Sequence, residues 1–264
     1  MLNILVCIKQ VPDTTIIKID PVKKTLIRDG VPSIVNPFDA YALEQAVQLK
    51  EKVGGTVTVV TMGLPQAKAA LKECLSKGAD KAYLMTDRAV GGSDTLATSY
   101  ILSCVARKLG PFDLIFCGKQ AIDGDTGQVG PEMAEHLGIP QITYATAVDY
   151  EDEQLKVRRE VDDGWEVIGA QLPAIVTVNK TEKEPRMATL MSKMAANRAV
   201  IEEIHCADVV EMDLERVGLK GSATKVVKTF TPDRTKNGVK LQDLPAADAA
   251  RELMALLTDK RLIS

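Results

Sequence analysis

The sequence predicts an α/β protein built on a Rossmann-like, open and mostly parallel sheet with helices on both faces. Two observations carry this prediction. Between about residues 2 and 142, short apolar runs typical of buried strands alternate with amphipathic helical patterns. Glycine and small polar residues gather where the apolar runs end, which is the edge at which open parallel sheets bind their ligands.

The alternating strands and helices have recognisable start and stop signals. Asn36 or Asp39 can cap the first helix, Gly78 ends the second, and Gly110-Pro111 ends the third. The strands are predicted at residues 2–8, 56–61, 81–85 and 113–117, and the helices at residues 36–52, 65–77, 93–109 and 130–137.

Two regions depart from this alternation. Residues 12–35 are predicted to form a hairpin-like excursion, and a small β-rich region with turns at Asp152-Glu153 and Asp162-Asp163-Gly164 follows from about residue 144. Its strands are predicted at residues 147–150, 155–161, 165–171 and 174–179.

The rest of the chain predicts a C-terminal extension with one amphipathic helix at residues 246–262, whose apolar stripe includes Leu253 and Leu257. We therefore expect an α/β domain over residues 1–180, which includes the hairpin-like strands, and a separate segment over residues 181–264.

Composition narrows the class of protein. The 264 residues are 45% hydrophobic, which is enough for a full core, and a net charge of −3 gives no basic face for nucleic acid or an anionic membrane. Five cysteines without a CxxC pair predict reduced core thiols. The N-terminus shows neither a signal peptide nor a membrane span, so we expect a soluble, cytoplasmic protein.

Residues 113–131 are the most informative stretch. An apolar strand is followed by a glycine-rich loop with two carboxylates and then by Pro131, which suits the first turn of a helix. Bare N–H groups and the helix dipole favour a nucleotide's phosphates at such a place. The loop is neither a GxGxxG nor a Walker A motif, and an ordinary strand-to-helix connection is the alternative interpretation.

Four strand ends should meet at one edge of the sheet, and all four are rich in small or polar residues. Their agreement favours a nucleotide crevice over a purely structural sheet. These segments are residues 7–9, 61–63, 91–95 and 118–129.

The sequence gives little support for catalysis by conventional side-chain groups. The two histidines, His136 and His205, have no partners at metal-ligand spacing, so no metal site is predicted. Asp123 and Asp125 could form an acid/base pair, but carboxylates in such a loop more often form turns or accept ribose hydroxyls. No catalytic residue is therefore assigned, and a binder or electron carrier whose cofactor supplies the chemistry is favoured.

Five motifs resemble the β subunits of electron-transfer flavoproteins, over essentially the whole chain. The resemblance implies a Rossmann-like fold and an α-subunit partner that carries FAD. The β subunit holds AMP in simple carriers of this family and a second FAD in electron-bifurcating members. The motifs are Val-Cys-Ile-Lys-Gln-Val-Pro-Asp13, Asn36-Pro-Phe-Asp39, Gly118-Lys-Gln-Ala-Ile-Asp-Gly-Asp-Thr-Gly-Gln128, residues 157–177 and Glu184-Pro-Arg-Met-Ala-Thr-Leu190.

The same resemblance implies cofactor contacts at the strand ends selected above. The stretch at residues 91–98 is similar to the FAD-bearing subgroup and adds Asp94, Thr95 and Thr98 as contacts of the flavin or its ribityl chain, although plain helix capping by Ser93 or Asp94 is the alternative. The AMP contacts of the family map onto Cys7, Asn36, Asp39, Met62, Gly118, Gln120, Asp123, Asp125, Thr126, Gly127, Gln128 and Val129.

The resemblance therefore implies an electron-bifurcating subunit. NADH would pass a hydride to FAD on this chain, one electron would go to ferredoxin or flavodoxin, and the other would go through the α-subunit FAD to a partner dehydrogenase. An AMP-binding carrier subunit is the alternative. A third class, an AMP-sensing or ATP-hydrolysing protein, is disfavoured because this sequence lacks residues for phosphoryl chemistry.

Partner contacts are implied in residues 181–264. Residues 182–198 resemble the family's docking loop for a dehydrogenase, with Leu190, Met191 and Met194 as an adaptable apolar patch. Alternatively, Leu190 and Met194 pack one face of a short helix. The helix at residues 246–262 is expected to reach over the α subunit as part of a C-terminal arm.

Overall fold

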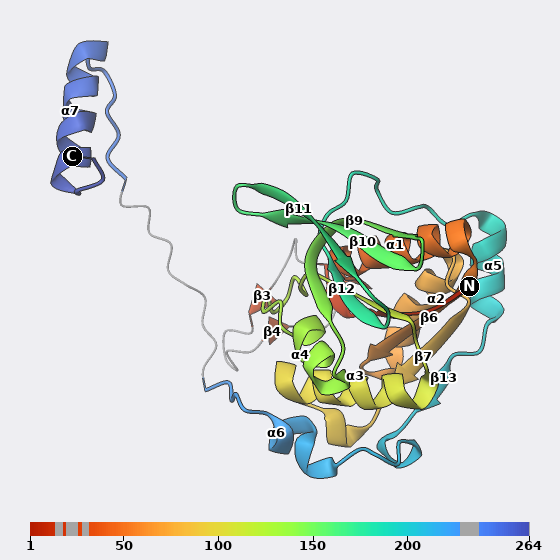
Figure 1. The fold of residues 1–264 in the computed structure, drawn as a ribbon. Coiled ribbons are helices and arrows are strands. Elements are labelled where there is room, and N and C mark those ends of the chain that lie inside the picture. The colour runs from red at the N-terminus through yellow and green to blue at the C-terminus, as the bar shows by residue number, and fades with distance from the viewer. Residues whose placement is uncertain (14–17, 20–25, 28–31, 228–237, 264) are drawn as a thin grey trace. The chain divides into compact units, whose positions relative to one another are not determined.

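The computed structural model describes residues 1–13, 18–19, 26–27, 32–227 and 238–263. The chain divides into two compact units, Met1–Lys228 and Thr229–Ser264, which are described separately. Among the described residues, nine strands of the first unit form one sheet in the order β11-β10-β9-β12-β8-β1-β6-β7-β13 (Figure 1). Their bounds are β1 Leu2–Cys7, β6 Gly55–Met62, β7 Lys81–Met85, β8 Leu114–Gly118, β9 Gln141–Glu151, β10 Gln154–Val161, β11 Gly164–Ala170, β12 Ala174–Val178 and β13 Glu202–Ile204.

The chain begins in the middle of this sheet. From β1 it moves outward through β6 and β7 and then returns to the other side of β1 to form β8. All of these neighbouring pairs are parallel, so Cys7 at the end of β1 lies between Val60 and Cys117. The point where the strand order reverses is where doubly wound sheets bind ligands.

Helices cover both faces of the sheet. Residues Ile4 and Val6 of β1 pack into one buried cluster with α1 and α2, whereas Leu5 and Cys7 pack into another with α3 and α4. This alternation is the expected result of successive side chains pointing to opposite faces of a strand. The predicted open α/β fold is confirmed. The helices are α1 Pro37–Val53, α2 Lys68–Ser76, α3 Thr95–Leu109 and α4 Val129–Leu137, with short 3-10 turns at Pro65–Ala67 and Arg88–Val90.

The predicted β-rich region is present, but it extends the main sheet. Strands β9, β10 and β11 are joined as antiparallel hairpins, whose first turn has Asp152 and Glu153 at positive φ. Strand β12 then enters between β8 and β9 and pairs with both in parallel. Strand β9 begins at Gln141, before the predicted start, because its first residues pair with β12.

Two antiparallel pairs lie in the predicted excursion after β1. Strand β2 (Gln10–Pro12) pairs with β5 (Ser33–Val35), and β3 (Lys18–Ile19) pairs with β4 (Leu26–Ile27). These pairs agree with the predicted hairpin-like excursion, and the other residues of the stretch lie outside the described part of the chain.

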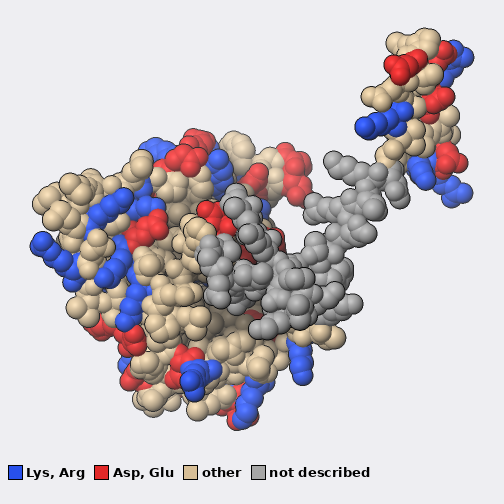
Figure 2. Space-filling model, turned by 180° about the vertical axis from the view of Figure 1, so that it is seen from behind, with Lys and Arg blue, Asp and Glu red and all other residues tan. Residues whose placement is uncertain are grey.

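After β12 the first unit continues with short elements. These are α5 Leu190–Arg198, the 3-10 turns Cys206–Asp208 and Leu214–Arg216, and α6 Gly218–Gly221. The second unit holds α7, Ala246–Asp259, in which no residue is buried. Among the described residues, no helix is long and apolar enough to cross a membrane. On the face shown in Figure 2, acidic and basic side chains are interspersed.

Candidate functional site

A cavity of about 330 Å³ opens at the carboxyl ends of β1, β6 and β8. Its volume is at the lower end of the range of about 300–1,000 Å³ that is usual for ligand pockets. The N-terminal ends of α3 and α4 complete its wall. Twelve of the predicted cofactor contacts line it, namely Cys7, Asp39, Met62, Asp94, Thr95, Thr98, Gly118, Gln120, Thr126, Gly127, Gln128 and Val129.

Asn36 does not line the cavity but binds the backbone of the loop that follows β8. The side chain is fully buried, its Nδ2 donates to the Gln120 carbonyl at 2.8 Å, and its Oδ1 accepts from the Ile122 N–H at 3.1 Å. An amide with both groups paired in this way fixes the backbone of the loop. In the structure Asn36 therefore positions loop residues and does not line the cavity.

The two loop carboxylates also make contacts within the protein. The Lys9 ammonium donates to Asp123 at 2.6 Å, and Gln120 Nε2 donates to Asp125 at 2.8 Å. Asp125 has a φ of 52°, in the left-handed region that Asp tolerates in turns. Neither carboxylate is among the cavity-lining residues. The turn-forming interpretation therefore fits Asp125, and Asp123 is paired with a cation.

Asp39 joins the ends of the two central strands. Its carboxylate accepts the Lys9 N–H at 2.7 Å and the Gly118 N–H at 3.1 Å. Burial raises the pKa of this carboxyl to about 7, although hydrogen bonds from Asn36, Lys9 and Gly118 lower it. Asp39 is thus a buried acid at the switch point, in contact with the backbone after both β1 and β8.

The N-terminus of α4 is open toward the cavity. Gln128 is its N-cap residue, and no side chain caps the helix. Gln128, Val129 and Gly130 all line the cavity. The first N–H groups of a helix need acceptors and carry the positive end of its dipole, so they suit a phosphate or pyrophosphate. The structure thus fits the phosphate part of a nucleotide.

Hydroxyl and apolar side chains form the other end of the cavity. Ser93, Thr95 and Thr98 line it together with Leu102 and Met62. A wall of this kind offers hydrogen bonds for a polyhydroxyl chain and apolar contact for a ring system.

Two residues at this end also make contacts within the protein. Thr95 Oγ1 donates to Gln128 Oε1 at 3.0 Å, which links α3 to the residue before α4. Asp94 lines the cavity and also caps α3, because its Oδ1 accepts the Ala97 N–H at 3.1 Å. Asp94 therefore caps α3 as well as lining the cavity, and its other oxygen accepts from Thr224.

Two cysteine thiols also line the cavity. Cys7 and Cys117 face each other across β1 and β8, and both line the cavity. A hydrogen bond with Cys7 and burial raise the pKa of the Cys117 thiol well above its usual value. A protonated buried thiol is a poor nucleophile, so Cys117 acts as part of the cavity wall.

Several lining residues were missed as individual contacts. Leu102 could have been found from helical spacing, because Thr95, Thr98 and Leu102 follow one face of α3. Cys117 and Gly130 required knowledge of strand register and helix packing, since a Cβ on Gly130 would lie 2.6 Å from Thr177. The others are Ile8, Lys9, Ser93, Lys119, Ala121 and Gly124.

The predicted docking residues are on the surface. Leu190, Met191 and Met194 belong to α5 and are exposed, whereas Ala196 on the same helix is buried against the rest of the protein. Leu190 and Met191 are each 75% exposed and do not pack inside this chain, whereas Met194 is 45% exposed.

A doubly wound sheet with a cavity and an open helix N-terminus at its switch point defines a nucleotide-binding α/β protein. Comparison with known proteins gives the family. The electron transfer flavoprotein domain matches residues 23–209. A protein of Thermoanaerobacterium thermosaccharolyticum, electron transfer flavoprotein subunit beta, is 52% identical over 90% of this chain and 91% of its own length. The chain therefore belongs to the electron transfer flavoprotein β-subunit family.

Two other relatives extend this similarity to nearly the whole chain. The electron transfer flavoprotein subunit beta of Clostridium acetobutylicum is 48% identical over 99% of this chain and 100% of its own length. The caffeyl-CoA reductase-Etf complex subunit CarD of Acetobacterium woodii is 44% identical over the same shares. These alignments include the cavity, α5 and nearly all of the second unit.

Proposed function

We propose that this chain is the β subunit of a heterodimeric, electron-bifurcating flavoprotein and binds FAD in the cavity at the switch point. The complex takes electrons from NADH, sends one to ferredoxin or flavodoxin, and delivers the other through the FAD of the α subunit to a partner dehydrogenase. FAD, when bound, supplies the conversion of a two-electron donation into single-electron deliveries.

One observation carries the choice of FAD. The cavity continues from the open N-terminus of α4 to the hydroxyls of Ser93, Thr95 and Thr98 at the start of α3. The helix N-terminus suits a phosphate of either nucleotide, whereas FAD alone would bring a ribityl chain and a flavin ring to the wall around the start of α3. A ribityl chain and flavin ring would use those hydroxyls and the apolar side chain of Leu102.

The residues of this chain bind and orient the cofactor. The N–H groups at the start of α4 hold the phosphate, and the thiols and Met62 form an apolar part of the wall. Asn36 and Asp39 fix the backbone around the cavity. The name of the Acetobacterium woodii relative, a subunit of a reductase–Etf complex, supports assembly with a redox partner.

Two surfaces serve assembly in this proposal. The exposed apolar side chains Leu190, Met191 and Met194 contact the dehydrogenase. Helix α7 packs on the α subunit, which would bury Leu253 and Met254, both exposed in their own unit. The alternative is a non-bifurcating β subunit with structural AMP in the cavity, because the phosphate end alone would hold that nucleotide.

Cofactor content tests this choice. The β chain is produced together with its α subunit, the complex is denatured, and the released nucleotides are separated and quantified. We expect two FAD and no AMP for each heterodimer. One FAD and one AMP would establish the alternative, and exchangeable ATP would contradict both assignments.

The hydroxyl end of the cavity has its own test. In a Thr95→Val, Thr98→Val double variant, the two lost hydroxyls should weaken FAD binding roughly thirtyfold, because each hydrogen bond contributes about 1 kcal/mol. Binding is measured by titrating the apoprotein with FAD. Ser103→Ala is the control on the same helix, since the Ser103 hydroxyl is buried away from the cavity without a hydrogen-bond partner. A cavity that holds only AMP would contradict this prediction outright.

A further inference from the structure

Helix α5 is held at its C-terminal end and presents apolar side chains at its N-terminal end. Near its C-terminus Ala196 is buried, and Lys72 on α2 donates to the Asn197 carbonyl at 2.8 Å. Near its N-terminus Leu190 and Met191 are each 75% exposed, and Met187 just before the helix is 91% exposed. The orientation of this apolar end therefore depends on what holds the chain before residue 187.

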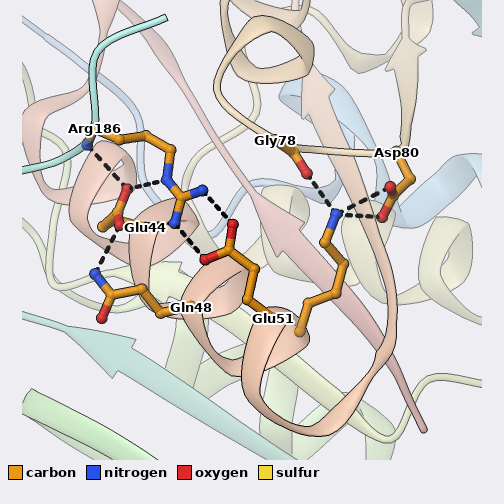
Figure 3. A network of polar contacts seen from close by, with 7 residues as sticks. Glu44, Gln48, Glu51, Gly78, Asp80 and Arg186 are labelled. Atoms are coloured by element: carbon orange, nitrogen blue, oxygen red, sulfur yellow. Dashed lines mark hydrogen bonds and ion pairs between the residues drawn. The ribbon is translucent and has the colours of Figure 1, made fainter.

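Arg186 holds that part of the chain to α1 (Figure 3). Its guanidinium donates to both Glu44 oxygens, at 2.9 and 3.1 Å, and to both Glu51 oxygens, at 2.5 and 2.9 Å. Its backbone N–H donates to Glu44 as well, at 2.9 Å. A planar guanidinium that donates to two carboxylates in this way fixes both the position and the orientation of the chain at Arg186.

The pairing is buried on one side. Glu44 is 5% exposed, and although burial raises the pKa of this carboxyl, hydrogen bonds from Arg186 and Gln48 bring it below its usual value. Arg186 also lowers the pKa of the Glu51 carboxyl. Loss of the guanidinium would leave the Glu44 charge buried and without its cation, which is costly.

One more contact secures the same stretch. Tyr41 on α1 donates its hydroxyl to Glu184 at 2.6 Å. Thus Tyr41, Glu44 and Glu51, which lie along α1, contact the chain just before the exposed apolar end. Helix α1 also carries Asp39, which lines the cavity. Asp39 and Glu51 are twelve residues apart, which at a rise of 1.5 Å per residue separates them by about 18 Å along the helix. One helix therefore carries contacts of both the cavity and the docking segment.

We propose that Arg186 is a positioning residue for partner docking, which fixes the apolar end of α5 to the helix that also contacts the cofactor cavity. By bridging Glu44 and Glu51, it presents Leu190 and Met191 to the dehydrogenase in one orientation. This proposal rests on the proposed function of α5 as the dehydrogenase contact. Arg186 is not among the residues that line the cofactor cavity.

The test separates positioning from stability. Arg186→Gln breaks the bridge but leaves Glu44 charged and buried. Arg186→Gln combined with Glu44→Gln removes the bridge without an unpaired buried charge. Arg186→Lys keeps the positive charge but loses the planar guanidinium that pairs with both carboxylates. Leu190→Ala removes a contact side chain while the bridge stays intact. Each variant is assembled with the α subunit.

Four quantities are measured for every variant. The midpoint of thermal unfolding, Tm, reports stability. Amide hydrogen exchange over residues 187–198 reports how firmly α5 is held. The KM for caffeyl-CoA reductase, taken as the partner probe because a 44% identical relative belongs to that complex, reports docking. The NADH oxidation rate with a tetrazolium dye reports the cofactor site.

In both variants that carry Arg186→Gln, the amides of residues 187–198 should exchange at least tenfold faster and the KM should rise about tenfold. The rate of NADH oxidation with the dye should stay unchanged. The combined variant should regain most of the lost Tm but keep the raised KM, and Arg186→Lys should be intermediate. Leu190→Ala should raise the KM without changing the exchange.

A combined variant that regains both Tm and KM, or unchanged exchange in Arg186→Gln, would overturn the proposal. Failure of the wild-type complex to reduce the reductase would instead contradict the docking function on which the proposal rests. A normal dye rate in that case would leave the cofactor assignment standing.

Discussion

Replacing Gly118 with alanine is expected to destabilise the protein and to empty the cavity. The new Cβ would lie 2.2 Å from Asp39 Oδ1 and 2.8 Å from the backbone nitrogen of Asp39. Atoms cannot approach so closely, so the end of β8 must move away from α1. Overpacking of this kind costs about 1–3 kcal/mol, which for a unit of this size lowers Tm by roughly 2–12 °C.

Thermal unfolding and nucleotide retention measure this effect. Gly124→Ala is the matched control for stability, because it lies in the same loop and a Cβ there would meet nothing within 4 Å. We expect Gly124→Ala to unfold at the wild-type temperature and Gly118→Ala to lose most of its bound nucleotide. Equal Tm values for the two variants would mean that the contact between Gly118 and Asp39 relaxes at no cost.

The stability of the protein should fall as pH rises from about 4 to 7 through the titration of Asp39. Its pKa is about 7 in the folded state against 3.8 for an ordinary Asp side chain, so in this interval the folded state binds more protons than the unfolded state. Stability then decreases with pH. A shift of about three units corresponds to at most about 4 kcal/mol.

The comparison of wild type with Asp39→Asn isolates this titration. Asparagine does not ionise, so the difference in unfolding free energy between the two proteins should change between about pH 4 and 7 in favour of the variant. The variant also presents an NH2 group to one of two backbone donors, which costs about 1–3 kcal/mol at every pH. Denaturant unfolding at several pH values measures both effects, and parallel curves would contradict the assignment of the raised pKa.

Local patterns were sufficient for much of the fold. The strand predicted at residues 81–85 is β7 itself, and the other βα strands and helices agree within a few residues, because periodicity and Gly or Pro punctuation are local signals. The cavity was foreseen because strand ends in a parallel sheet share one edge. These parts of the structure are encoded by neighbouring residues.

Long-range pairings were not foreseen. The entry of β12 between β8 and β9 depends on which strands meet, and a single sequence does not specify this. The loop residues Asn36, Asp123 and Asp125 were assigned to the cofactor, whereas their closest partners are Gln120, Ile122 and Lys9. Likewise the bridge between Arg186 and Glu44 spans 142 positions of sequence, beyond any local pattern.

The late position of β12 in the sequence has a consequence for synthesis on the ribosome. The Lys119 N–H donates to the Val178 carbonyl at 2.7 Å, so the loop that follows β8 is completed by a strand translated about sixty residues later. Until then the apolar β8 is an unpaired edge, and such edges invite aggregation. In a nascent chain, β8 therefore keeps one edge open to pairing with other chains until β12 has emerged and occupies it.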